Sequence, residues 1–315
     1  MWFLSKYEMA GALLGRSANN WWQKQHWQDQ QRYRKWTYGG GAVVVVAATT
    51  FALAHTEEDP ITGRRKLILF DRKLLRELAE KQTSLILDRY RFHLMSPSDP
   101  TYKAVSEVMA KILRANQHLA RVKNQEWSLV ILNDPSVNAY MFPNGTMFVH
   151  TGVIREARNL DQLAIIIGHE IAHCVQEHAL DQISRRFFVE FLCVLIITAL
   201  NARLSLKPAV VATALAAAVK HFVVLLPNSR QMEFEADKVG MMLSARACVD
   251  VREGVAFWSL MEAGESNVER NLLWWLRTHP TARSRKIRLD KLLSEANQVR
   301  RSVDCPKLPA VKTKR

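Results

Sequence analysis

A helical pattern near the middle of the chain contains the hexapeptide Gly168-His169-Glu170-Ile171-Ala172-His173. Because an α-helix turns about 100° per residue, positions i and i+4 share a face, and His169 and His173 can direct two imidazoles at one metal ion. Glu170 lies beside them, where its carboxylate can take a proton from a metal-bound water. Two neutral imidazoles suit zinc, which leaves room for a third protein ligand and a water. The hexapeptide therefore predicts a zinc site with Glu170 as general base.

A chance match is the alternative, because the pattern HExxH also occurs by accident. The helix that begins near Asp161 carries apolar residues suited to burial, namely Leu163, Ile166, Ile167, Val175 and Ala179. Two histidines and a glutamate are unfavourable in such a helix unless they bind something. The surroundings of the motif therefore favour the metal site.

The composition describes a basic chain with enough apolar residues for a sizeable core. It has 315 residues, 48% of them hydrophobic, and a formal net charge of +14. Such basicity is compatible with nucleic acid, an anionic membrane or an organellar address. The sequence has no zinc-knuckle spacing and no RNP-like aromatic motif, and its basic residues are spread along the chain. We therefore predict membrane or mitochondrial association and no nucleic-acid partner.

The cysteines are widely separated in the sequence: Cys174, Cys193, Cys248 and Cys305. No CxxC pair occurs, which argues against a disulfide scaffold. Cys174 follows His173 directly, but the two side chains point about 100° apart on a helix, so we interpret Cys174 as a small core residue.

Residues 1–36 form a basic N-terminal arm that is rich in Trp, Gln and Arg and has two acidic residues, Glu8 and Asp29. Basic, acid-poor N-termini of this kind resemble mitochondrial transit segments. A disordered basic arm has the same composition, and both interpretations stay open.

The stretch 37–54 contains no charged residue and has about the minimum length of a transmembrane helix. A secretory signal is the alternative, but 36 residues precede the stretch and no clear cleavage site follows it. Basic residues lie before the stretch, and Glu57, Glu58 and Asp59 lie after it. The positive-inside rule then places the following domain, residues 55–315, on the side opposite to synthesis or import.

Short periodic segments lie between this stretch and the hexapeptide. They predict a turn at 60–64, a strand at 66–70, helices at 73–80 and 102–119, and a strand at 127–132. The second of these helices is amphipathic, with Val105, Val108, Met109, Ile112 and Leu113 on its apolar face. We expect a mostly helical α+β domain of the zincin type, with a small sheet or hairpin beside the HExxH helix and one preceding transmembrane helix.

A β-hairpin is predicted at 138–149, because Asn144-Gly145 is a strong turn signal between two short strands. An exposed strand edge near a metal site can pair with an extended peptide through main-chain hydrogen bonds. The residues expected to do so are Asn138, Ala139 and Tyr140. An ordinary structural hairpin has the same signature, so both interpretations stay open.

Two apolar stretches follow within residues 187–226, joined by an expected turn at 201–207. The first contains Glu190, and the second contains Lys220 and His221. Each is short for a full membrane span. A buried core hairpin, a hairpin that dips into the bilayer and two spans are all compatible with the sequence, and we favour a helical hairpin at or in the membrane.

The third metal ligand is expected from a second helix. Glu233 and Asp237 lie one turn apart on one face, and the small residues Gly240 and Ser244 continue that face and allow close packing against the HExxH helix. Glu233 is the expected ligand, and Asp237 is the expected acceptor for a histidine N–H. Glu235 points elsewhere on the helix and is the weaker candidate.

Three motifs thus occur together: HEIAH at 169–173, Ser-Arg-x-x-Glu-x-x-Ala-Asp at 229–237 and Thr278-His279-Pro280. Together they resemble the HtpX and CAAX prenyl protease type of zinc metallopeptidase, the gluzincins. Pro-Ile-Thr-Gly-Arg at 60–64, the single N-terminal span and the predicted hairpin narrow the resemblance to the mitochondrial inner-membrane metalloendopeptidases whose activity overlaps that of the m-AAA protease. The likeness covers roughly residues 56–295.

The resemblance implies one zinc ion per subunit with three protein ligands, namely His169, His173 and Glu233. It implies Glu170 as the general base and His279 as a second catalytic residue, which stabilises the oxyanion of the tetrahedral intermediate. Without the resemblance, a histidine before a proline is more often structural. Arg285 matches a basic position that follows the His-Pro pair in this family and orients it.

The resemblance also implies where the protein acts. The expected location is the mitochondrial inner membrane, with a single pass and the catalytic domain facing the intermembrane space. The expected substrates are inner-membrane proteins, including a dynamin-like GTPase of membrane fusion that is cut upon depolarisation or stress. Protein quality control, self-cleavage, homo-oligomers and the lipid bilayer as a partner are further implications.

Two alternatives stay open. One is the same chemistry in another membrane, as in a prenyl-protein peptidase, although that type has many spans and this chain shows one clear span. The other is a membrane-anchored scaffold without turnover, against which the intact HExxH, ExxxD and His-Pro motifs argue.

Overall fold

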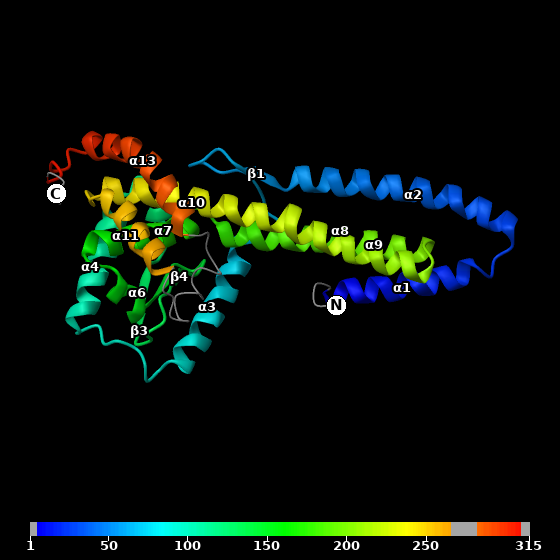
Figure 1. The fold of residues 1–315 in the computed structure, drawn as a ribbon, viewed down its shortest axis with the longest axis horizontal. Coiled ribbons are helices and arrows are strands. Elements are labelled where there is room, and N and C mark those ends of the chain that lie inside the picture. Colours follow the sequence, from blue (N-terminus) through cyan, green and yellow to red (C-terminus); the bar gives the residue numbers. More distant parts are fainter. Residues whose placement is uncertain (1–4, 266–281, 310–315) are drawn as a thin grey trace. The chain divides into compact units, whose positions relative to one another are not determined.

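The computed structural model describes residues 5–265 and 282–309, which fall into two compact units (Figure 1). Unit 1 contains Met1–Asp71 and Leu180–Ser229, and unit 2 contains Arg72–Ala179 and Arg230–Arg315. Helices predominate, and each unit has a small sheet. This mostly helical α+β architecture confirms the predicted fold class.

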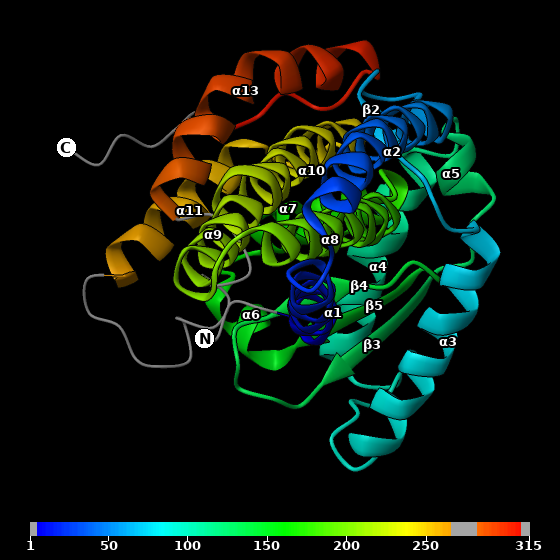
Figure 2. The ribbon, with the colours of Figure 1, turned by 90° about the vertical axis from the view of Figure 1, so that its right-hand side faces the viewer.

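The sheet of unit 2 has the strand order β3-β5-β4, formed by Ser128–Leu132, Thr146–His150 and Ala139–Met141 (Figure 2). β3 runs parallel to β5, and β4 is antiparallel to β5, as the predicted hairpin requires. The turn needs glycine, because Gly145 has a φ of +83°. All residues of β5 are buried, so β5 is the centre of the sheet and β4 is an edge.

Helices surround this sheet in unit 2: α3 (Arg72–Arg89), α4 (Pro100–Ala115), α5 (Ala120–Lys123), α6 (Thr151–Glu156), α7 (Leu160–Val175), α11 (Arg252–Glu265) and α13 (Ala282–Ser302). α4 buries all the apolar residues predicted for it. Its end at Ala115 is earlier than expected, because the Asn116 side chain donates to the Ile112 carbonyl at 2.7 Å and closes the helix. α7 begins within one residue of the predicted start.

The HExxH helix α7 packs closely against α10 (Leu226–Arg246). A Cβ atom added to Gly240 would lie 2.7 Å from the His169 backbone, and one added to Gly168 would lie 2.4 Å from Ser244 Oγ. Ser244 Oγ donates to the Ala164 carbonyl at 3.2 Å. The small residues therefore allow the close approach that the sequence predicted.

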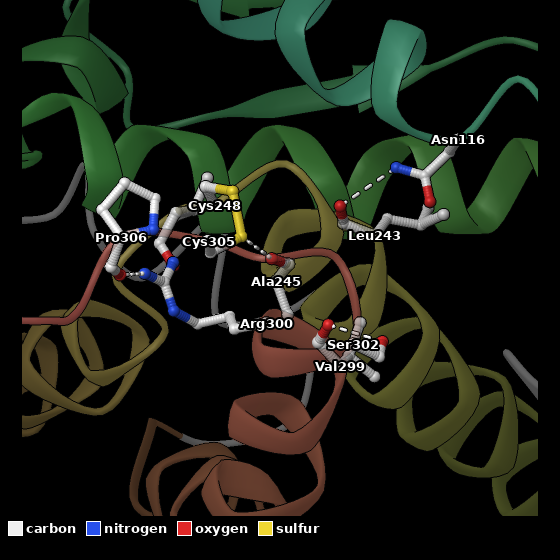
Figure 3. Close-up of a disulfide and its surroundings, with 10 residues drawn as sticks. Asn116, Leu243, Ala245, Cys248, Val299, Arg300, Ser302, Cys305 and Pro306 are labelled. Atoms are coloured by element: carbon white, nitrogen blue, oxygen red, sulfur yellow. Dashed lines mark hydrogen bonds between the residues drawn. A yellow bond between two sulfur atoms is a disulfide. The ribbon is translucent and has the colours of Figure 1, made fainter.

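A disulfide joins Cys248 and Cys305, which are 57 residues apart (Figure 3). The expectation against a disulfide scaffold is wrong for this pair. Spacing rules detect cysteines that are near in sequence, whereas here the chain after α13 returns to the end of α10. Beside the disulfide, Arg300 donates to the carbonyls of Val249 and Pro306.

Unit 1 begins with two helices, α1 (Lys6–Trp22) and α2 (Trp27–Ala54). Ser5 caps α1 in a capping box with Glu8, so the structure describes this part of the predicted basic arm as a helix. α2 is long and apolar enough to cross a membrane by length and composition. It starts ten residues before the expected stretch 37–54, because residues 27–36 contain helix-forming Gln, Arg and Lys and no proline.

The remaining elements of unit 1 are a β-hairpin and an α-helical hairpin. β1 (Thr56–Glu58) pairs with β2 (Arg65–Leu67) across the predicted turn. The strand expected at 66–70 stops at Leu67, and the Leu69 N–H is taken by Ser184 Oγ at 3.0 Å. The helical hairpin consists of α8 (His178–Arg203), α9 (Leu206–Val219) and the π-helical segment η1 (Lys220–Leu225). Its turn is shorter than the predicted 201–207.

Candidate metal centre

Two helices of unit 2 bring the three expected ligands together. α7 carries His169 and His173, whose Nε2 atoms lie 3.1 Å apart. α10 carries Glu233, whose carboxylate oxygens lie 3.4 Å from these nitrogens, one oxygen to each. Zinc–nitrogen bonds of about 2.0 Å at tetrahedral angles separate two ligand atoms by about 3.3 Å. The donor set and its spacing therefore fit one zinc ion.

Glu170 adjoins this cluster and is also buried. Its Oε1 atom has no hydrogen-bond partner within residues 5–265 and 282–309. An unsatisfied buried polar atom costs about 1–3 kcal/mol, and more when it is charged. A carboxylate oxygen kept in this state is suited to receive a water or a substrate, as a general base must.

His169 is held from behind by two buried residues. Its Nδ1 lies 3.1 Å from Asp237 Oδ1, and Arg285 Nε donates to the same carboxylate at 3.0 Å. Arg285 Nη2 also lies 2.8 Å from His169 Nδ1, but arginine has no acceptor, so a proton on Nδ1 is donated to the Asp237 carboxylate. Nε2 of His169 then keeps its lone pair for a metal ion.

These contacts shift the pKa values of His169 and Asp237. Burial and the Arg285 charge act to lower the pKa of His169, but the carboxylates of Asp237 and Glu233 outweigh them and raise the pKa to about 9. Burial acts to raise the pKa of Asp237, whereas Arg285 and His169 lower it below its ordinary value. In the metal-free protein, a proton thus occupies the imidazole that the metal would use.

His173 has a partner of its own that the sequence did not reveal. Its Nδ1 lies 2.9 Å from His178 Nδ1, and His178 Nε2 lies 3.2 Å from Glu235 Oε2. Both partners are buried. One placement of the protons gives every contact in this series a donor and an acceptor. In it, His173 Nδ1–H donates to His178 Nδ1, and His178 Nε2–H donates to Glu235. Nε2 of His173 is then free of a proton, as Nε2 of His169 must also be when a metal ion is bound.

His178 reaches His173 because the helix ends early. The sequence predicts one helix from near Asp161 through Ala179, whereas α7 ends at Val175 and Glu177 adopts a φ of +51°. This turn directs the His178 side chain toward His173. Glu235 contacts His178 and is not among the three clustered ligand atoms found within the described residues.

The other predicted residues have different outcomes. His279 lies outside the residues that the structure describes. Asn138 and Ala139 are buried at the edge strand β4, and burial raises the pKa of the half-buried Tyr140 to about 12. Burial likewise raises the pKa of Cys174 to about 12, so its thiol stays neutral, although its side chain is only part-buried and not in the core as predicted.

Comparisons with known proteins show the family to which the chain is similar. Residues 103–293 match the model of peptidase family M48. The chain is 34% identical to the mitochondrial metalloendopeptidase OMA1 of Danio rerio, covering 98% of this chain and 67% of that protein. It is 31% identical to that of Homo sapiens over 94% of this chain and 58% of the relative, and 29% identical to that of Schizosaccharomyces pombe over 81% and 72%. The chain thus spans about three fifths to two thirds of the length of the two vertebrate relatives.

Proposed function

The chain belongs to peptidase family M48, and we propose that it is a membrane-anchored zinc metalloendopeptidase of mitochondria. The observation that carries this proposal is the convergence of two imidazoles and one carboxylate within 4.8 Å of one another, beside a Glu170 oxygen that has no partner among the described residues. The names of the relatives support both the peptidase activity and the organelle.

The proposed reaction is hydrolysis of a peptide bond without a covalent acyl-enzyme. A zinc ion held by His169, His173 and Glu233 would supply Lewis acidity, which polarises the scissile carbonyl and lowers the pKa of water. Glu170 takes the proton from the attacking water and later passes it to the leaving amine. His279 donates to the oxyanion, a role that rests on the family resemblance.

Two hydrogen-bonded chains would keep the ligands in place. Asp237, held by Arg285, orients His169, and His178, held by Glu235, orients His173. Partners of this type fix the tautomer and the ring orientation of a metal-binding histidine. His178 and Glu235 are therefore proposed as positioning residues, in addition to Asp237 and Arg285.

The substrate would bind in extended form along β4, at Asn138, Ala139 and Tyr140. In the described sheet β4 lies at the edge, and it contacts the HExxH helix α7. Pairing through main-chain hydrogen bonds needs no particular side chain, which suits an endopeptidase with little sequence preference.

The proposed site of action is the mitochondrial inner membrane, with α2 as a span and the catalytic unit in the intermembrane space. The basic residues before the apolar part of α2 and the acidic residues after it support this orientation. We extend the proposal to membrane-protein substrates, to stress-linked quality control with processing of a dynamin-like GTPase, and to homo-oligomers with self-cleavage. These parts rest on the family resemblance.

The deciding experiment is the substitution Glu170→Gln. Removing the base should lower proteolysis of a membrane-protein substrate roughly 10²–10⁴-fold, while zinc, measured by atomic absorption, stays near one per chain. Glu156→Gln, an exposed residue of α6, is the matched control and should leave both unchanged. Unchanged proteolysis in Glu170→Gln would refute the enzyme and favour a scaffold.

A further inference from the structure

The helices of unit 1 expose large apolar side chains beyond α2 itself. Leu13 on α1 is 72% exposed, Val211 on α9 is 68% exposed and Leu215 on α9 is 63% exposed. On α8, Phe187, Phe191 and Ile196 also face outward. An apolar surface of this extent in water would lead to association, so it indicates a covering partner.

The interior of the same helices is polar. Lys220 Nζ lies 2.8 Å from Glu8 and 2.9 Å from Glu190, which joins α1, α8 and η1 through charges. Asn201 donates to Thr213 at 3.0 Å and joins α8 to α9. These helices therefore carry apolar side chains on their outer surface and paired charges in their interior. A water-soluble helical bundle has the reverse arrangement, whereas a bundle in lipid is expected to have this one.

The contact between α1 and α8 has a second membrane feature. Gly11 and Gly15 form a GxxxG motif on the face of α1 that meets α8 (Figure 1). A Cβ atom on Gly15 would lie 2.4 Å from the Thr198 carbonyl oxygen, so only glycine permits this approach. Small residues at four-residue spacing allow helices to pack within a bilayer.

The two ends of unit 1 differ in charge. The turn of α1–α2 and the turn of α8–α9 lie together, because Arg16 donates to the Leu204 carbonyl and Arg203 stacks on Trp22. We call this end the basic tip; its charged residues are Arg16, Lys24, Asp29, Arg32, Arg34, Lys35, Arg203 and Lys207. At the opposite end, by β1 and β2, the basic residues Arg64 and Lys66 pair with Asp181 and Asp59. Exposed aromatic residues at the basic tip, Trp21, Trp27 and Tyr33, suit the headgroup region.

Within the described residues, α2 has the length and composition of a full span, and the apolar stretches of α1, α8 and α9 are shorter. On α8 the apolar stretch between Arg186 and Arg203 rises about 24 Å, and α9 rises about 21 Å, compared with a hydrocarbon core of about 30 Å. The arginines at both ends of the α8 stretch can extend to the headgroups and compensate for the shorter span.

We infer that unit 1 is an integral membrane bundle, in which the hairpins α1–α2 and α8–α9 both cross the bilayer and the basic tip emerges on the matrix side. This inference rests on the proposed membrane anchoring and not on the proposed chemistry. The sequence predicts one membrane-crossing helix, whereas this inference has four. It also places α1, which belongs to the expected basic arm at residues 1–36, in the bilayer.

Cysteine labelling tests the inference on the full chain in mitoplasts. In a background of Cys174→Ser and Cys193→Ser, single cysteines are placed at the basic tip (Ser205→Cys), at the opposite end (Pro60→Cys) and on the outer face of α9 (Leu215→Cys). Leu85→Cys in α3 is the matched control, since Leu85 is 55% exposed and Leu215 is 63% exposed. The probe is a membrane-impermeant maleimide, added before and after a pore-forming peptide.

The inference requires residue 60 to react from outside and residue 205 to react only after pore formation. Residue 215 should react at least tenfold more slowly than residue 85 under both conditions. Reaction of residues 60 and 205 from the same side, or equal rates at 215 and 85, would overturn it. Protection of 215 with labelling of 205 from outside would indicate a protein partner and would also overturn it. Proteolysis by the same variants tests the proposed function separately.

Discussion

The two units differ in where they expose apolar side chains and in what their buried charges contact. In unit 2, Met147, Phe148 and Val149 are fully buried at the centre of the sheet, and the buried carboxylates Glu170, Glu233 and Asp237 lie at the candidate metal centre. In unit 1, Glu8 and Lys220 are buried and leucines and valines are exposed. This difference is what the inferred membrane position of unit 1 requires, with lipid around unit 1 and water around unit 2.

Buried charges also have different tasks in the two units. In unit 1 they join helices, as Lys220 does between Glu8 and Glu190. In unit 2 they end on the metal-binding imidazoles, as Asp237 does on His169. The predictions below test unit 2, where each buried contact should matter in water.

The largest effect is expected from Arg285→Met, which leaves Asp237 buried without its cation. Both side chains are 2% exposed, and breaking such a pair costs about 3–5 kcal/mol in the free energy of unfolding. Urea unfolding of the metal-free protein in lipid nanodiscs measures this loss. Arg283→Met is the control, because Arg283 is 77% exposed and should cost at most about 1 kcal/mol. Equal losses would contradict the assigned role of the buried pair.

The disulfide is expected to contribute less. Cys248→Ser with Cys305→Ser opens a loop of 57 residues and should lower the stability of unit 2 by roughly 2–4 kcal/mol. Thermal unfolding with and without dithiothreitol measures the effect. The reductant should destabilise the wild type and leave the double variant unchanged; a reductant effect of the same size in both would show that the disulfide does not form.

Zinc affinity should fall moderately when the hydrogen bonds from His173 through His178 to Glu235 are broken. His178→Ala leaves His173 Nδ1 without its acceptor, and zinc affinity should fall about 10–100-fold in a chelator competition. His178→Gln should retain most of the affinity, because its amide can accept from His173 and donate to Glu235. His118→Ala, an exposed histidine of the same unit, is the control. Equal losses for Ala and Gln would indicate packing instead of positioning.

The smallest expected effect is the release of a proton from His169 when zinc binds. His169 has a pKa of about 9 without metal, so it is protonated near neutral pH and must lose that proton to bind zinc. The same shift stabilises the metal-free fold below the ordinary pKa of about 6.5 and is lost as pH rises through 9. Calorimetry at about pH 7.5 in buffers of different ionisation enthalpy should show about one proton released per zinc. Asp237→Asn should reduce this number, and release of no proton by the wild type would contradict the assignment.

The local parts of both units could be predicted from sequence because their causes are local. The 3.6-residue period places His169 and His173 on one face, the spacing of Glu233 and Asp237 does the same on α10, and Asn144-Gly145 specifies the hairpin. The apolar face of α4 follows from the same period and is buried as predicted. Helix ends were less accurate, since they depend on caps such as the Asn116 side chain.

The tertiary structure alone decided which distant residues meet. Cys248 reaches Cys305 because α13 returns the chain to the end of α10, and no local period contains that information. His178 reaches His173 because α7 stops at Val175, one turn earlier than the helical pattern suggested. The polar interior of unit 1 likewise appears only when α1 packs on α8, since a single helix cannot show which of its faces is covered. The periodicity of the sequence determines which residues share a face of a helix or strand, whereas tertiary packing determines which residues that face contacts.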